Sequence, residues 1–276
     1  METQLKPDIV IEPPVGWRFL GLKELWYYRE LFFFLAWRDV KVRYKQTILG
    51  VAWVVLQPLC TMAIFTFLFG KLAAIPTSGV PYPLFALSGL VPWIFFSAGV
   101  TNAAQSVVSD ANLIKKVYFP RLIVPTASVS AAFIDLTLMF LLLLLLTGFY
   151  GIAPSWKWCL LPLFFVNSYL TTLGVSYWLA GFNALFRDVK HIIPFVIQVG
   201  MFLSPIAYPA SLVPEAWQML YALNPVVGVV EGLRAILFGS EVSFPALVLS
   251  LVVGGLTFLS GMVYFKKIET NFADIV

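Results

Sequence analysis

The chain has 276 residues, of which 60% are hydrophobic and 12% are charged, and its mean hydropathy is +0.89. Soluble globular domains carry about 25% charged residues, so this composition excludes a soluble protein and predicts an all-α integral membrane protein. The net charge of +4 is informative mainly through its distribution, because basic residues in membrane proteins report topology. Cys60 and Cys159 lie in apolar runs without a CxxC spacing, so we expect neither a disulfide nor a metal site.

The chain begins with a polar, proline-containing segment, residues 1–21, which we expect to be a flexible leader. It lacks a short apolar core with a cleavage site, so no signal peptide is expected. Residues 22–46 place apolar and charged side chains at roughly helical spacing, which favours an amphipathic helix in the cytoplasmic membrane interface. An ordinary helix packed on the rest of the protein is the alternative.

A basic collar precedes the first long apolar run, in the sequence WRDVKVRYKQTILGVAWVVLQP of residues 37–58. After Lys45 the next charged residue is Lys71. A charge at the centre of a membrane helix costs about 2.5 to 3.5 kcal/mol on insertion scales. The collar is therefore expected to stay at the aqueous face while the following run enters the membrane. Its charged residues are Arg38, Asp39, Lys41, Arg43 and Lys45.

Residues 47–276 are expected to form one six-span transmembrane domain. Apolar runs of about 20 helical residues suffice to cross a hydrocarbon core of about 30 Å. Residues 204–244 contain four prolines yet keep apolar stretches, which predicts short re-entrant helices between the fifth and sixth spans. The six spans are predicted at residues 47–70, 84–108, 122–149, 156–182, 193–203 and 245–265.

The distribution of basic residues predicts that both termini are cytoplasmic. Of the 18 Lys and Arg residues, only Lys71, Lys157 and Arg234 fall on the opposite side of this arrangement. Cytoplasmic segments carry the excess of basic residues in membrane proteins, so the N-terminal segment and the C-terminal tail are both placed inside.

The sequence offers little for catalysis. Its one histidine, His191, lies in a charged interruption between apolar runs, so neither a His-based triad nor a multi-histidine zinc site can be built in the membrane. The phosphate-binding pattern GxxxxGK[ST] does not occur in the sequence. We therefore expect no enzyme activity in this chain, and any energy from a nucleotide must come from another chain.

Two charged features lie within predicted membrane segments. Asp135 is a candidate proton or cation site, because intramembrane acids are often functional. The favoured alternative is a buried carboxylate that accepts hydrogen bonds from hydroxyl groups of its neighbours, such as Ser128, Ser130 or Thr137. Glu231 and Arg234, three residues apart, are expected to form a local pair.

Aromatic residues recur on the first two predicted spans. Trp53 and Gln57 share a face of the first, and Phe85 and Phe96 nearly share one of the second, with Trp93 beside them. Aromatic rings can stack on sugars and let a polymer slide. At any single position, however, packing or an interfacial belt is the more common reason for an aromatic stripe.

Four blocks in order resemble one known family. They are WRDVKVRYKQTILGVAWVVLQP, NLIKKVYFPRLIVP, LFRDVKHIIPF and LNPVVGVVEGLR. Together they resemble the transmembrane subunit of ABC type 2 polysaccharide exporters, which export O-antigen, capsule or teichoic acid polymers on a lipid carrier. The resemblance extends from about residue 22 to the end of the chain.

The resemblance implies a bacterial inner-membrane permease that pairs with itself and with two ATPase subunits. The ATPase would bind ATP and Mg, leaving no cofactor in this chain. The channel, at the permease dimer interface, would carry a lipid-linked polysaccharide, with O-antigen the first choice. Membrane lipids are a further implied partner. No nucleic-acid partner is expected. Expected channel residues are Tyr44, Trp53, Gln57, Phe85, Trp93, Phe96 and Phe202.

The same resemblance implies two cytoplasmic segments that dock on the ATPase, residues 110–119 and 186–191. The expected coupling residues are Asn112, Leu113, Ile114, Lys115, Lys116, Phe186, Arg187 and Asp188. Two other functions remain open. One is an ATPase-independent transporter or channel for a small solute that uses Asp135. The other, least favoured, is a transferase acting on lipid-linked sugar.

Overall fold

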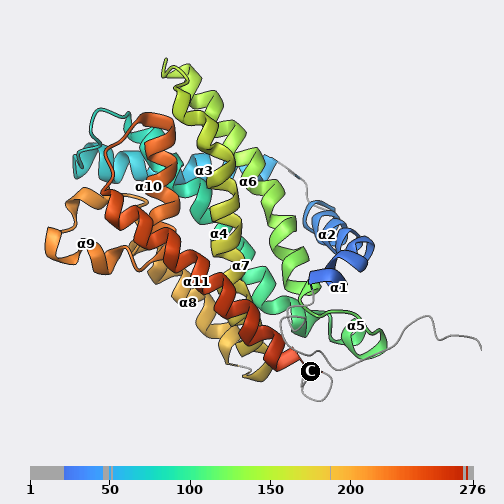
Figure 1. The fold of residues 1–276 in the computed structure, drawn as a ribbon. Coiled ribbons are helices and arrows are strands. Elements are labelled where there is room, and N and C mark those ends of the chain that lie inside the picture. The colour runs from blue at the N-terminus through green and yellow to red at the C-terminus, as the bar shows by residue number, and fades with distance from the viewer. Residues whose placement is uncertain (1–21, 46–49, 51, 187, 270–271, 273–276) are drawn as a thin grey trace, which may run out of the picture.

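The computed structural model describes residues 22–45, 50, 52–186, 188–269 and 272, so the leader 1–21 and Arg187 lie outside the described residues. Within the described residues the chain is helical and has no β-strand (Figure 1). Two helices, α1 (Leu22–Tyr27) and α2 (Arg29–Tyr44), precede the long apolar helices.

The long helices form the body of the molecule. They are α3 (Ala52–Phe65), which continues as a π-helix (Thr66–Leu72), α4 (Tyr82–Ser109), α6 (Ile123–Phe149), α7 (Leu161–Leu185), preceded by a 3-10 turn (Trp156–Leu160), and α11 (Phe244–Glu269). Shorter helices connect them: α5 (Ala111–Lys116), α8 (Val189–Phe202), α9 (Glu215–Tyr221) and α10 (Pro225–Phe238), with a 3-10 turn at Ala210–Leu212.

The expected all-helical membrane architecture is confirmed. Among the described residues, five helical segments are long and apolar enough to cross a membrane, or up to six if the bent pair α9 and α10 counts as one span. The predicted fifth span, residues 193–203, falls short. It lies within α8, whose 14 residues extend only about 21 Å at ~1.5 Å per residue. That length is less than the hydrocarbon core of about 30 Å.

Helix α4 is the centre of the bundle. It packs against α6 and α7 and also touches α3, α8 and α10. Its residues 84–93 are all buried, whereas α3 lies at the periphery, where Pro58 is its only buried residue and the others are exposed or half-buried. This burial explains why the sequence of α4 is apolar almost throughout and does not have an amphipathic pattern.

Helices α7 and α11 approach each other through glycines. A Cβ atom added to Gly261 would lie 2.5 Å from the carbonyl oxygen of Gly174, and one added to Gly174 would lie 2.6 Å from the backbone nitrogen of Phe258. Such spacing leaves no room for a side chain, so the two backbones touch directly. Small residues at helix contacts are the usual means of tight packing in membranes.

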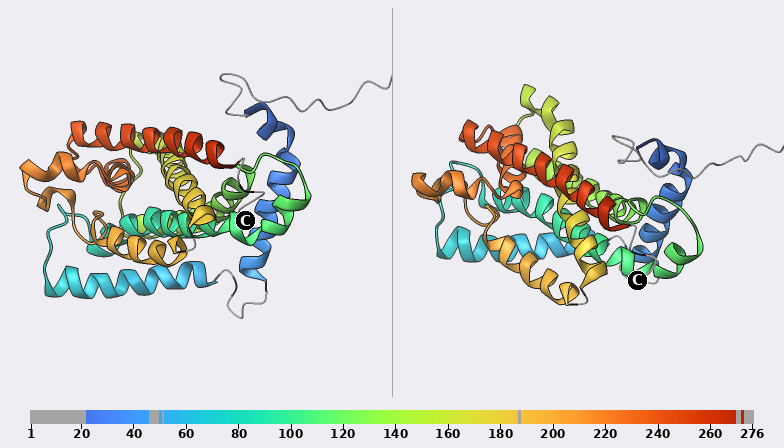
Figure 2. Two further views of the ribbon diagram at one scale, coloured as in Figure 1. Left: turned by 90° about the horizontal axis from the view of Figure 1, so that it is seen from below. Right: turned by 60° about the horizontal axis from the view of Figure 1, so that its bottom comes forward.

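The N-terminal segment, expected as one helix over residues 22–46, consists of α1 and α2, with Tyr28 between them. Helix α2 lies across one end of the bundle, at a steep angle to the long helices (Figure 2). It packs on α6 and buries Leu35 and Val40, while Phe33 and Trp37 remain exposed. The packed-helix alternative is therefore correct for one side of α2. Its position in a membrane interface stays a prediction.

The two ends of the bundle differ in their contents. The end near α2 also holds α5 and the last turn of α11 (Figure 1), where the ring of Phe265 lies 5.3 Å from that of Phe272. The opposite end holds α9 and the loops before α4 and before α11. The start of α2 and the end of α11 thus lie on the same side of the bundle.

Candidate functional site

An ion-pair cluster joins α2 to the end of α4. The guanidinium of Arg38 donates to both carboxylate oxygens of Asp110, from Nη1 to Oδ1 at 2.9 Å and from Nη2 to Oδ2 at 2.8 Å. It also donates to Oδ1 of Asp39 at 2.8 Å and 3.1 Å. Hydrogen bonding to Asp110 is the main cause that raises the pKa of Arg38 above its ordinary value. A two-oxygen arginine–carboxylate contact fixes orientation as well as distance.

The same cluster reaches α6. The hydroxyl of Ser128 donates to Oδ2 of Asp39 at 2.9 Å, so Asp39 bridges Arg38 and α6. Asp110 lies at the junction of α4 and α5. Through Arg38, the position of α2 is therefore tied to the residue at which α5 begins.

A second contact between α2 and α6 lies at Asp135. Its carboxylate is paired with the guanidinium of Arg43 and accepts a hydrogen bond from the hydroxyl of Tyr44. Burial and the bond to Asp135 raise the pKa of Tyr44 above its ordinary value, so the phenol stays protonated. Asp135 is thus a neutralised, hydrogen-bonded carboxylate.

The expected hydroxyl partners of Asp135 were wrong. Thr137 and Ser130 donate to the carbonyl oxygens of Phe133 and Thr126, four residues earlier on their own helix. This is a common alternative for hydroxyls within helices. The hydroxyl of Ser128 donates to Asp39 and not to Asp135. The prediction failed because the folding of α2 back onto α6 brings an arginine to the acid. The excess of basic over acidic residues in the collar, residues 37–45, was the sequence feature that could have indicated a basic partner for Asp135.

Three expected channel residues meet beside Asp135. Tyr44, Trp53 and Gln57 line one cavity of about 260 Å³, together with Arg43, Asn102 and Asp135. They come from α2 and α3, and Asn102 comes from α4. The cavity therefore lies where the N-terminal helix, the peripheral helix and the central helix converge.

The other expected channel residues lie elsewhere. Trp93 and Phe96 line a larger, mainly apolar cavity of about 550 Å³ beside α8 and α9. Phe85 is buried, and the Arg234 guanidinium carbon lies 3.6 Å from its ring centroid. Phe202 is 60% exposed and lines none of these cavities. In a single chain, the seven residues therefore do not form one continuous track.

The first expected coupling segment contains α5. Asn112, Lys115 and Lys116 are exposed there and Leu113 is half-buried. Ile114 is 5% exposed and belongs to the main core. A docking partner could therefore reach the polar side of α5, whereas Ile114 anchors the helix to the bundle.

In the second expected coupling segment, Phe186 is 59% exposed and Asp188 is exposed, between the end of α7 and the start of α8. Arg187 lies outside the described residues. The side chain of Asn183, just before this break, donates to the carbonyl oxygen of Ala104 on α4 at 2.8 Å. The end of α7 is thereby held to the same helix that leads into α5.

The region between α8 and α11 folds as two short helices bent by 107°. Asn224 organises the bend, since its Oδ1 accepts from the Val226 nitrogen at 3.0 Å and caps α10. Its Nδ2 donates to the Leu203 carbonyl oxygen at 3.1 Å. The expected pair of Glu231 and Arg234 is confirmed, with Nη1 and Oε1 3.0 Å apart.

Arg234 does more than pair locally, which sequence reasoning missed. It is 1% exposed, and it donates to Ser88 Oγ and to the carbonyl oxygens of Phe85 and Ile206 at 3.1 to 3.2 Å. These acceptors lie on α4 and on the loop after α8. One buried guanidinium therefore fastens the bent helix pair to the centre of the bundle.

Comparison with known proteins places the chain in a transporter family. The family model described as ABC-2 type transporter matches residues 30–238. The chain is 33% identical over 220 residues to the O-antigen export system permease protein RfbA of Myxococcus xanthus, covering 79% of this chain and 84% of that protein. It is 27% identical over 253 residues to RfbA of Klebsiella pneumoniae, covering 91% and 97%.

A more distant relative is the polysialic acid transport protein KpsM of Escherichia coli, 21% identical over 199 residues, which cover 70% of this chain and 76% of KpsM. The family match spans α2 to α10 and so includes the ion-pair cluster, the coupling segments and the bent helix pair. This chain belongs to the ABC-2 type transporter family, as a membrane permease.

Proposed function

We propose that this chain is the permease half of an ATP-driven exporter, which moves a lipid-linked polysaccharide from the cytoplasm across the bacterial inner membrane. O-antigen is the first candidate cargo, because relatives from two genera carry that name and match over most of their length. ATP and Mg would be bound by a partner ATPase subunit. Two permeases and two ATPases would form the complex, with the channel between the permeases.

The observation that carries the mechanism is the clamp of Arg38 on Asp110. If the ATPase docks on the exposed polar side of α5, closing of the ATPase dimer displaces α5 and the end of α4 together. Because Arg38 binds Asp110 and Asp39 binds Ser128, α2 would move with α4 and α6 rather than slide over them. Rigid movement of such connected helices is a recognised way to convert a local push into channel opening.

The proposed topology places α2, α5 and both ends of the transmembrane domain in the cytoplasm. Its support is the excess of Lys and Arg on that side and the shared position of α2, α5 and the end of α11. We further propose the division into a leader at 1–21, an interface segment at 22–46 and a six-span domain at 47–276. The bent helices α9 and α10 would form the outer gate.

The small-solute alternative gains no support from Asp135. A proton or cation relay needs a carboxylate that can change partners, and this one is neutralised by Arg43 and bound by Tyr44. Its geometry favours a link between α2 and α6.

Two measurements test the proposed function. We expect the chain, expressed with its neighbouring genes and purified in mild detergent, to give a mass equal to two permeases and two ATPases. Deleting its gene should remove the polysaccharide from the cell surface and leave lipid-linked polymer inside. A complex without a nucleotide-binding subunit, or unchanged surface polysaccharide, would contradict the proposal.

A further inference from the structure

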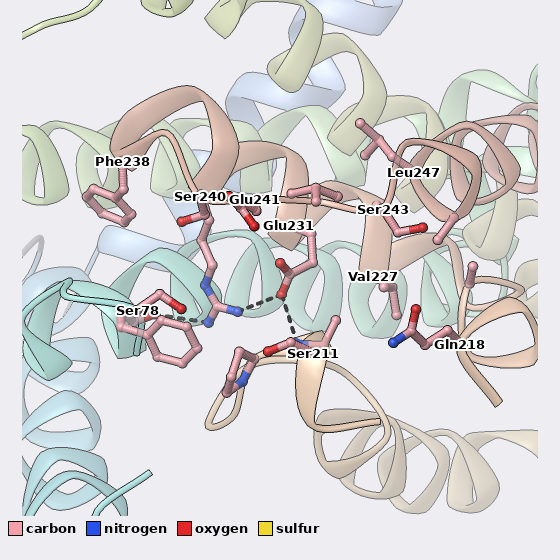
Figure 3. A pocket seen from close by; sticks show the side chains of 18 of the residues that line it. Ser78, Ser211, Gln218, Val227, Glu231, Phe238, Ser240, Glu241, Ser243 and Leu247 are labelled. Atoms are coloured by element: carbon pink, nitrogen blue, oxygen red, sulfur yellow. Dashed lines mark hydrogen bonds and ion pairs between the residues drawn. The ribbon is translucent and has the colours of Figure 1, made fainter. Parts of the chain in front are cut away.

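A polar cavity of about 450 Å³ lies at the end of the bundle opposite α2. Its walls come from the loop before α4, from the 3-10 turn and α9, and from α10 with the loop that leads into α11. Figure 3 shows Ser78 and Ser211 on one side and Ser240 and Glu241 on the other, with Glu231 between them. Its volume is in the usual range for small-ligand sites.

This cavity differs in its chemistry from two of the other cavities. The 550 Å³ cavity beside α8 and a third cavity of about 260 Å³ beside α10 are lined mainly by apolar side chains. The polar cavity instead gathers hydroxyl, amide and carboxylate groups from loops far apart in the sequence. Those most relevant to a ligand are Ser78, Ser211, Gln218, Ser240, Glu241 and Ser243.

Several of these groups have unused hydrogen-bonding capacity. Within the described part of the chain, the side chains of Ser211, Ser240 and Ser243 form no hydrogen bond. The Gln218 side chain uses only its nitrogen, which donates to the Val213 carbonyl oxygen at 3.2 Å. A serine hydroxyl both donates and accepts, which matches the hydroxyls of a sugar. The ring of Phe238 adds an apolar surface for a sugar face.

The arginine of this cavity is not free to bind an anionic ligand. Arg234 reaches the cavity, but Glu231 and the carbonyl oxygens of Phe85 and Ile206 occupy its guanidinium. Glu241 adds an exposed negative charge. The ammonium of Lys157 lies close by, 3.9 Å from where a Cβ at Gly239 would be, so one charge of each sign is left. The cavity therefore has no free arginine for a phosphate, whereas an uncharged sugar would meet hydroxyl partners.

We propose that this cavity binds uncharged sugar units of the polymer as they leave the channel at the outer face. The inference rests on the proposed function and deepens it by assigning a sugar site to α10 and its flanking loops. Many weak hydroxyl contacts suit a polymer that must move on. The buried pair of Arg234 and Glu231 provides a fixed floor for the site.

The first test measures the access of a membrane-impermeant maleimide in whole cells. The background chain carries Cys60→Ser and Cys159→Ser, because both cysteines are free and exposed. Ser240→Cys reports the cavity, and Ser155→Cys, on the exposed loop between α6 and α7, is the matched control. Labelling is compared in cells that make the polymer and in cells that cannot.

We expect polymer synthesis to slow labelling at position 240 at least threefold and to leave position 155 unchanged. Equal labelling of position 240 in both cell types would overturn the sugar site. So would a failure of the maleimide to reach position 240 in either cell type, because the cavity would then not open outward. Both results can occur in cells that export polymer normally, so they are distinguishable from failure of the proposed function.

A second measurement fills the cavity. We expect Ser240→Trp to lower surface polysaccharide at least fivefold relative to Ser155→Trp at equal permease level in the membrane. Wild-type export by Ser240→Trp would contradict the site. If Ser240→Trp lowers the permease level itself, the labelling of position 240 decides the question.

Discussion

Two arginine clusters lie at opposite ends of this permease, and their surroundings differ. At the end opposite α2, Arg234 is 1% exposed and is enclosed by its own α10, by α4 and by the loop after α8. At the α2 end, the Arg38 side chain is 36% exposed and joins elements far apart in sequence. The first cluster can exchange its partners only by disrupting the core. The second can break and reform in contact with water.

This contrast implies different contributions. A buried charge that loses its partner is strongly destabilising, whereas a partly exposed ion pair contributes about 0.2 to 1 kcal/mol. Arg234 therefore acts mainly on stability. Arg38 contributes less to stability, so its ion pairs are suited to a contact that transmits movement between helices. The variants below compare the two ends of the bundle, from the largest expected effect on stability to the smallest.

The largest effect is expected from Glu231→Ala. Removing this carboxylate leaves Arg234 buried and unpaired, which should cost about 3 to 5 kcal/mol of stability. Thermal unfolding of the detergent-purified permease should show a clearly lower Tm. The matched control is Glu241→Ala, which removes an exposed carboxylate from the same cavity. Equal Tm values for the two variants would show that Arg234 does not depend on its pair.

An intermediate effect is expected from Asp135→Asn. The amide can still accept a hydrogen bond from Tyr44 but no longer neutralises Arg43, so we expect a loss of about 1 to 3 kcal/mol, measured by the same unfolding experiment. Thr137→Ala, exposed on the same helix, should leave the Tm unchanged. If Asp135→Asn abolished transport at wild-type Tm, Asp135 would instead be a transport site.

The smallest effect on stability is expected from Lys115→Glu on the exposed side of α5. Its Tm should match that of the wild type, while stimulation of the partner ATPase should fall, because the reversed charge lies on the proposed docking surface. Lys71→Glu, an exposed lysine on the π-helix that continues α3, should change neither quantity. Normal ATPase stimulation by Lys115→Glu would remove Lys115 from the docking surface.

The parts of this structure that could be predicted from sequence are those set by local pattern. The helix predicted at 122–149 is observed as Ile123–Phe149, since a long apolar run leaves few alternatives in a membrane. The pair of Glu231 and Arg234 also follows from spacing on one helix.

The predictions were wrong where the structure depends on contacts between residues far apart in the sequence. The apolar residues 193–203 resemble a span, but the helix that contains them, α8, has only 14 residues and is too short to cross. The partner of Asp135 depends on the return of α2 across α6, which no local pattern encodes. Arg234 was read as a local partner because its other acceptors, on α4 and the loop after α8, are far away in sequence.

The most direct test of the central claim, that α2 and α5 move as one through Arg38 and Asp110, is a charge exchange. Surface polysaccharide is measured for Arg38→Asp, for Asp110→Arg and for the double variant, at equal permease level, and the Tm is measured alongside. Each single variant should lower export at least tenfold and also lower the Tm, because Arg38→Asp leaves like charges beside Asp39 and Asp110 and Asp110→Arg places a second guanidinium beside Arg38. The double variant should recover most of it, because an arginine at position 110 can pair with carboxylates at positions 38 and 39. Normal export by both single variants, or a double variant as inactive as either single one, would contradict the account.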